Sequence, residues 1–463
     1  MTQAGTRAWK WAWWNQFPAP LRAVARVRLI AMVGAGGVLY LTPMVFHREA
    51  FSASSVGDGL ALAALTGTAG RLLSGLLLDR GRSGSLPVGL AALCAMVGDG
   101  LLLGAEGFGG YLAGQVLVGL AAGLYWPAIE LAVPQCSGSL PSARGFALVR
   151  SADALGVVCG ALLGALLAAL GWLRGIYLVD ILCVLTMLAL VLRRPLPASP
   201  PALAGPAGTA TGPAWGWIPP LLPLLVVTVL ATALPALMQG ALPLDLVRGG
   251  LTRPALPEEL GALTIGLQLA LLVLLQWPVG QALARRPVSV GLALSLACFA
   301  VGCGLLALSA VISHGLAVLL VAQLPLALGV AAFLPTATEA VVELSPEGRQ
   351  GLAMALFSQC FALSAFAAPL AAGRLLDAQG HGVGLWLGMG SLCLLGLPLA
   401  RGLERFQRRN LLQVLTGPAG GAQAGGERRI LYRFPAASPR RTRTGEQGGK
   451  GDHPGRRGGQ DPP

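Results

Sequence analysis

Two opposite charges stand inside an apolar stretch of the chain, at a spacing that would let them act together. Arg150 and Asp153 are three positions apart in the segment RSAD, so a helix would carry them on one face. Asp153 would lie about 13 Å beyond Arg144 at 1.5 Å per residue, away from bulk water. A carboxyl group there could load and release a proton. The alternative is a static ion pair that holds helices together.

Other charged residues within apolar stretches are further candidates. Asp180 is a second candidate for proton coupling, and Arg71 would either join Arg150 and Asp153 or bind an anion. Glu130 and Glu339 occupy similar places in the two halves of the chain, near inner helix ends. Both are candidates for the substrate cavity, with a gating or structural role favoured. Two acids near outer helix ends are expected to be solvated, namely Asp58 and Asp99.

Five uncharged side chains are candidates for lining a substrate cavity: Gln115, Tyr125, Trp126, Phe333 and Gln359. Core packing is an equal alternative for the aromatic residues, and helix–helix hydrogen bonds are an alternative for the glutamines. Tyr125 and Trp126 stand just before Pro127, where we expect a break in the helix.

The composition identifies the class of protein that must position these residues. Of the 463 residues, 54% are hydrophobic and 11% are charged, and the mean hydropathy is +0.68. Soluble domains carry about 25% charged residues. The chain is therefore expected to be an all-α polytopic membrane protein.

Twelve apolar stretches are long enough to span a membrane. We expect a basic N-terminal segment (1–26), a six-helix bundle (27–192), a linker (193–217), a second six-helix bundle (218–403) and a basic, disordered tail (404–463). The net charge of +13 lies largely at the two ends. Basic flanks predict that both termini are cytoplasmic, and they argue against nucleic-acid binding. The eight cysteines form no CxxC pair, so no metal site or cofactor is expected.

The segment GLLLDRGRS follows the second stretch and recurs in part as GQALARRPV. Gly75 and Arg80 reappear as Gly280 and Arg285, whereas Asp79 is replaced by Ala284. Two related halves are a common plan for secondary transporters. An anion at the C-terminal end of a helix opposes the helix dipole, so Asp79 needs a partner. Gly75 would let another helix approach closely.

These residues resemble a motif of the major facilitator superfamily, roughly G-x-L-x-D-R-x-G-R-R, on Gly75, Leu77, Asp79, Arg80 and Arg82. The resemblance implies two six-helix bundles and a cytoplasmic latch that forms in one state of alternating access. A simple topology anchor of positive charge is the alternative.

Gly156, Gly160 and Gly164 resemble the antiporter motif of the fifth span in that family. Alanines replace its proline and its last glycine. Ordinary close packing of helices explains the three glycines equally well.

The leading hypothesis is a monomeric, proton-coupled effluxer of the multidrug type, in the plasma (bacterial inner) membrane, acting on a small molecule. The alternatives are an uptake symporter for an organic anion or nutrient, with Arg71 and Arg150 as cationic contacts, and a transporter-like assembly scaffold. No enzyme motif is present, so an enzyme is not expected.

Overall fold

A computed structural model describes residues 14–140, 142–198, 218–283, 286–345 and 350–416. Twelve helices in these ranges are long and apolar enough to cross a membrane, which confirms the expected all-α polytopic class. The described ranges contain no β-strand beyond one isolated bridge. Most of the expected linker and tail, residues 199–217 and 417–463, lies outside the described residues.

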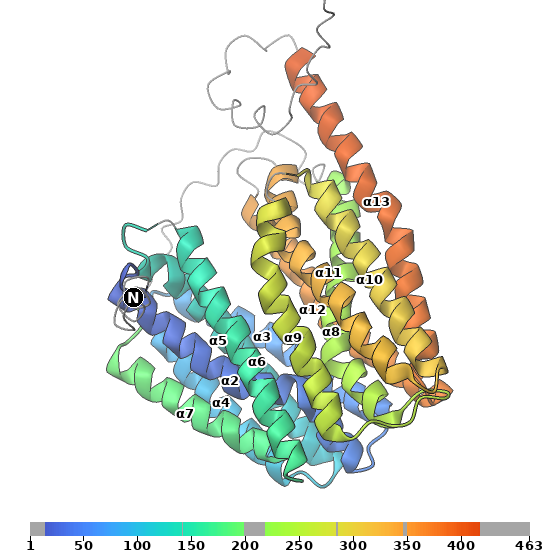
Figure 1. Ribbon diagram of the computed structural model, residues 1–463. Helices are drawn as coiled ribbons and strands as arrows, with labels where there is room; N and C mark the ends of the chain where they lie inside the picture. Colours follow the sequence, from blue (N-terminus) through green and yellow to red (C-terminus); the bar gives the residue numbers. More distant parts are fainter. Residues whose placement is uncertain (1–13, 141, 199–217, 284–285, 346–349, 417–463) are drawn as a thin grey trace, which may run out of the picture. The chain divides into compact units, whose positions relative to one another are not determined.

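The twelve spanning helices follow one another along the chain as two sets of six. Figure 1 colours the first set from blue to green and the second from green to red. The first set is α2 (Ala19–Arg48), α3 (Ala53–Asp79), α4 (Ser85–Gly104), α5 (Phe108–Cys136), α6 (Ser142–Ala169) and α7 (Gly175–Arg193). The second is α8 (Leu222–Arg248), α9 (Glu258–Leu283), α10 (Val288–Val311), α11 (Gly315–Leu344), α12 (Gln350–Gln379) and α13 (Val383–Thr416). A short 3₁₀ turn, Pro219–Leu221, precedes α8.

Each set packs in the same order. The first helix of each set packs on the fifth (α2 on α6, α8 on α12), and the fourth packs on the second and third (α5 on α3 and α4, α11 on α9 and α10). The repeat in the sequence thus corresponds to a repeat in the packing, as expected for two six-helix bundles.

Local chemistry sets several helix ends. Ser52 caps α3 by accepting a hydrogen bond from the Ser55 amide. Gly249 ends α8 with a φ of +86°, which favours glycine. The break expected at Pro127 is absent, because α5 continues through it to Cys136. Helices packed in a membrane protein tolerate an internal proline when neighbouring groups satisfy the freed carbonyl.

The buried core connects the two bundles at one end. We call the end that holds Arg48 and Arg248 the outer end, and the end that holds Asp79 the inner end, following the expected topology. Buried apolar residues in the outer halves of both bundles, such as Val45 and Leu242, belong to one continuous core. The inner half of the first bundle has a separate core in the described residues.

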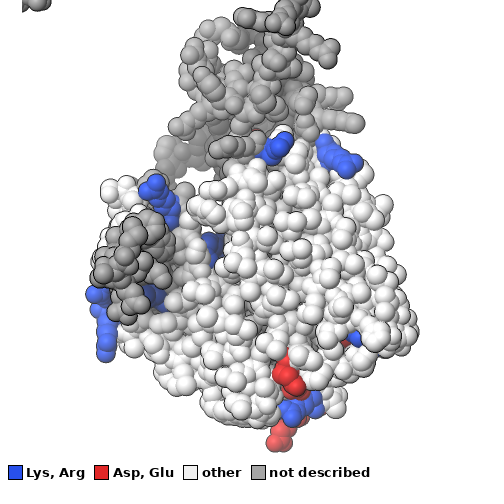
Figure 2. Space-filling view, viewed as in Figure 1, with Lys and Arg blue, Asp and Glu red and all other residues white. Residues whose placement is uncertain are grey.

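The visible surface agrees with a membrane environment. Figure 2 shows a face that is mostly free of charge, with acidic side chains towards the outer end. Large apolar side chains such as Leu274 and Trp277 are about 70% exposed on the helices, as lipid-facing residues would be.

Candidate functional site

Contacts between the bundles gather at the outer end. The helix pairs with the most extensive contact are α3 with α12, α6 with α9, and α2 with α8, and α3 also touches α8 and α2 touches α9. The central contact is made by Asp377 at the end of α12. Its carboxylate accepts hydrogen bonds from the backbone amides of Ala53 (3.0 Å) and Ser54 (2.7 Å) at the start of α3. Arg248 holds the same carboxylate at 2.7 Å. We call this arrangement the outer latch.

Two weaker ion pairs flank the outer latch. Arg374 lies 3.4 Å from Asp58, and Arg48 lies 3.7 Å from Glu258. Because the side chains of Arg374 and Asp58 are 62% and 41% exposed, this pair contributes little stability.

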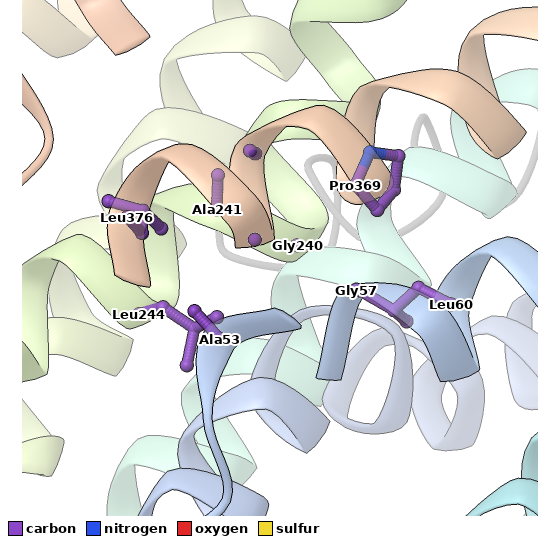
Figure 3. A pocket seen from close by; sticks show the side chains of 10 residues that line it. Ala53, Gly57, Leu60, Gly240, Ala241, Leu244, Pro369 and Leu376 are labelled. Carbon is purple, nitrogen blue, oxygen red and sulfur yellow. The ribbon is translucent and has the colours of Figure 1, made fainter. Parts of the chain in front are cut away.

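A small apolar cavity lies beneath the outer latch, where α3, α8 and α12 meet (Figure 3). Its volume of about 10 Å³ is room for one water molecule at most and excludes a substrate. Its lining residues are Ala53, Gly57, Leu60, Gly240, Ala241, Leu244, Pro369, Ala372, Gly373 and Leu376. Side chains at Gly57 and Gly373 would meet the backbone of the opposite bundle, so glycine is what allows this closure.

The motif at the inner end makes no latch with the residues that the structure describes. Asp79, Arg80 and Arg82 are exposed, and no hydrogen bond or ion pair joins Asp79 to another described residue. A Cβ at Gly75 would meet nothing within 4 Å, so the close helix approach expected there is not observed. The outer end is latched while the inner motif is free of described partners.

The buried charge in the inner half of the first bundle is Arg28. Its guanidinium Nε lies 3.0 Å from Asp153 Oδ1, and the two side chains are 2% and 17% exposed. The guanidinium carbon lies 3.5 Å from the centre of the Trp126 ring, a cation–π contact. The contact of Nε with Asp153 is an ion pair without hydrogen-bond geometry, and Nη1 likewise has no hydrogen-bond acceptor among the described residues. The charge of Arg28 thus depends on Asp153 and on the aromatic face.

The expected pair of Arg150 with Asp153 does not form. Arg150 instead contacts Glu130 on α5 at 3.2 Å, and both side chains are about half exposed. Positions three apart on a helix differ by about 60° in direction, so neighbouring helices can separate them. Asp153 turns towards α2, as does Gly156 three residues later.

Arg71 brings a third arginine to this region. It is exposed on α3 and interacts electrostatically with Glu130. Leu60, which faces Gly240 of the second bundle, lies eleven residues earlier on α3, close to three full turns. Arg71 therefore lies on the face of α3 that is directed towards the second bundle. We call Arg28, Arg71, Glu130, Arg150 and Asp153, with Trp126, the inner charge cluster.

The remaining candidates for the substrate cavity differ in how deeply their side chains are buried. Gln115, Tyr125 and Phe333 are buried in the helix packing, so they do not line an open cavity in this state. Gln359 is exposed on α12, and Glu339 is half-buried on α11. Asp180 is buried. Asp99, expected to be solvated, is fully buried, because α4 packs against both α5 and α7.

The glycine face of α6 packs closely, as its spacing predicts. Side chains at Gly156, Gly160 and Gly164 would collide with Leu29 and Met32, with Val33, and with Leu41 of α2. This contact brings Asp153 and Arg28 together.

Arg28 is the residue that sequence reasoning missed. It follows Arg22 and Arg26 and looks like part of the basic flank. The helix begins at Ala19, however, so Arg28 lies nine residues inside it, about 14 Å at 1.5 Å per residue. No group of three His, Cys, Asp or Glu side chains that could hold a metal ion occurs in the described ranges.

Similarity to known proteins is found at the level of fold. No protein-family model matches the sequence, and no curated protein matches it. Among solved structures, the peptide transporter POT in complex with alafosfalin aligns over 85% of this chain and 95% of its own, with a TM-score of 0.72 and 14% identity.

Two further solved structures give the same result. A POT family transporter in complex with a thioalcohol-conjugated peptide aligns over 84% of this chain and 96% of its own, with a TM-score of 0.71 and 11% identity. The nucleoside transporter NupG aligns over 83% of this chain and 99% of its own, with a TM-score of 0.66 and 10% identity. The chain therefore has the twelve-helix fold of the major facilitator superfamily.

Proposed function

We propose that this protein is a secondary transporter that takes up a small organic anion together with protons by alternating access. The observation that carries the proposal is the contrast between the two ends. The bundles share a core and a latch at the outer end. The inner charge cluster lies in the half of the first bundle whose core is separate.

In this proposal the structure represents the state that is open to the inner side. Asp377 closes the outer end by holding the start of α3. Asp79 and its arginines would close the inner end in the opposite state, which is why Asp79 has no described partner here. The two latches would alternate during transport.

The charge balance of the inner charge cluster favours an anionic substrate. It contains three arginines, Arg28, Arg71 and Arg150, but only two carboxylates, Asp153 and Glu130. Arg71 and Arg150 are exposed, and both interact with the carboxylate of Glu130. A substrate carboxylate or phosphate could therefore bind both arginines. Trp126, which is half-buried between Arg28 and Arg150, offers a ring face to the organic part of the substrate.

Asp153 supplies the coupling to protons. A proton on Asp153 cancels its charge and leaves the buried guanidinium of Arg28 without its counter-ion. An anion bound at Arg71 and Arg150 then restores the balance, so proton and anion favour each other's binding. Symport, in which proton and anion cross the membrane in the same direction, requires that the binding of each favours the binding of the other.

Efflux of the multidrug type, the leading hypothesis from the sequence, has less support. The similar solved structures are named as peptide and nucleoside transporters, and none of the three is named as a multidrug exporter. The positive surplus of the inner charge cluster also disfavours cationic drugs. A transporter-like assembly scaffold would show no substrate-dependent proton flux. We place the protein in the plasma membrane with both termini cytoplasmic.

The test uses proteoliposomes that contain a pH-sensitive dye. An acidic outer solution is combined in turn with a dipeptide, a dicarboxylate, a nucleoside and a cationic dye. We expect one of the anion-bearing probes to evoke inward proton flux that disappears in Asp153→Asn. Arg71→Gln and Arg150→Gln should raise KM for that probe, whereas Arg374→Gln at the outer end is the matched control and should not.

The other outcomes decide against the proposal. Outward proton flux evoked by the cationic dye indicates antiport. Flux that is equal in the wild type and in Asp153→Asn removes that residue as the coupling site. The absence of proton flux with every probe at several pH gradients would contradict transport and favour the assembly scaffold.

A further inference from the structure

Two acidic side chains meet between α4 and α7, and no described residue gives them a basic partner. Asp99 is fully buried and Asp180 is 6% exposed. Their carboxyl groups lie within hydrogen-bonding reach of each other. Both oxygens of Asp99 and Oδ1 of Asp180 receive no hydrogen bond from any described donor. Ionised carboxylates can only accept, so a bond between the two requires a proton on one of them.

The surroundings of this acid pair supply no compensating charge. The titratable groups that interact with it electrostatically are Tyr177 and Cys183, both on α7. From α2 the neighbour is Gly34, and no charged group of α5 or α6 acts on the pair within the described residues. Arg174, at the start of α7, is bound to two backbone carbonyls and to a carboxylate at the end of α2.

Electrostatics forbids two full charges in this place. Two carboxylates so close together, away from water, would repel each other and lose their hydration without compensation. Buried carboxyl dyads in other proteins solve this by sharing a proton. The acid pair is therefore expected to hold at least one proton while it is buried.

The position of the acid pair links it to both the outer side and the inner charge cluster. Asp99 and Asp180 each lie five residues from the outer end of their helix, about 8 Å at 1.5 Å per residue. The carboxylate of Asp180 fills the space that a side chain at Gly34 would need. Gly34 is on α2, six residues beyond Arg28, or about 9 Å along the same helix.

We propose that Asp99 and Asp180 form a proton-loading site. When the outer end is open, a carboxylate of the pair takes up one proton from the outer solution and becomes a carboxylic acid. The pair retains this proton, buried, in the state described here. The inference goes beyond Asp153 as the coupling site, and its coupling role rests on the proposed transport function.

The first test measures the protonation of the pair without transport. Infrared difference spectra of the purified full-length protein at neutral pH should show the carbonyl band of a protonated carboxyl group. The band should vanish in the Asp99→Asn/Asp180→Asn double variant and remain in Asp58→Asn, the matched control with an exposed outer carboxylate. Two amides hydrogen-bond to each other without an added proton, so the double variant should fold.

Three results would contradict the proposal that the pair shares a proton. The first is that the wild type lacks the band across a neutral pH series, and the second is that the band is unchanged in the double variant. The third is that the band appears only after Na⁺ is withdrawn. The last result would make the pair a cation site.

The second test measures coupling in proteoliposomes with the probe found active above. The double variant should still exchange labelled for unlabelled probe. Its accumulation of the probe driven by a pH gradient should be at least tenfold lower than that of the wild type. Accumulation equal to that of the wild type refutes the loading role and leaves a static hydrogen bond. If no probe is transported by the wild type, the transport function and the loading role fail together, while the infrared band still decides whether the pair shares a proton.

Discussion

Removing the carboxylate of the outer latch should loosen the outer end by a predictable amount. The first amides of a helix have no partner within the helix, so Ala53 and Ser54 depend on Asp377 for their hydrogen bonds. A side-chain cap of this kind contributes about 1 kcal/mol. A negative charge at a helix N-terminus adds about 0.3–1 kcal/mol. Asp377→Ala should therefore remove about 1.5 kcal/mol from the closed outer end, roughly a tenfold shift in its opening equilibrium.

Hydrogen exchange followed by mass spectrometry measures this directly. Peptides that contain the start of α3 and the end of α12 should exchange about tenfold faster in Asp377→Ala, because exchange reports the population of open states. The matched control is Asp58→Ala, which breaks the more exposed cross-bundle pair with Arg374 and should change exchange little. Unchanged exchange in Asp377→Ala, or an equal increase in both variants, would refute the assignment of Asp377 as the latch.

Three further predictions concern packing and buried charge. Arg253→Ala should destabilise the protein by about 3–5 kcal/mol in chemical unfolding, because Asp245, 3.3 Å away, would stay buried without its counter-ion; a loss below about 1 kcal/mol would contradict this. Gly160→Leu should prevent α2 from packing on α6 and lower the melting temperature strongly, whereas Gly104→Leu, where a Cβ meets nothing within 4 Å, should not. Gly75→Ala should leave the melting temperature of this state unchanged or slightly raised, because a Cβ there meets nothing within 4 Å. A slower transport cycle in the same variant would indicate that the inner ends approach closely in the opposite state.

The helices were predictable from the sequence because hydropathy and length alone decide which segments can span a membrane. Their ends and neighbours were not. Arg150 and Asp153 share a helix face by periodicity, but periodicity does not say which helix each side chain meets. Arg28 was hidden because a basic flank and the first turns of a spanning helix have similar composition. Asp99 was expected to be solvated because its distance from a helix end was visible in the sequence, whereas its burial against α7 was not.

Glycines were a more reliable guide than charges. The three glycines of α6 predicted a close helix contact, and the structure confirms it against α2. A missing side chain has one physical consequence, close approach, whereas a charge can be compensated by several kinds of partner. Gly75 is the exception, because the helix contact expected of it is absent in this state.

The outer latch also has a consequence for which substitutions the protein can tolerate during evolution. Asp377 binds the main-chain amide of Ser54, and the Ser54 side chain interacts with the same carboxylate, so only the backbone part of the contact is independent of the side chain at this position. Ser54 is half-buried, and most substitutions at this position should keep the two backbone hydrogen bonds of the outer latch. Proline is the exception, since it has no amide hydrogen to donate. The polar part of the closure thus depends on Asp377 of the second bundle, whereas the first bundle contributes backbone amides and the small size of Gly57.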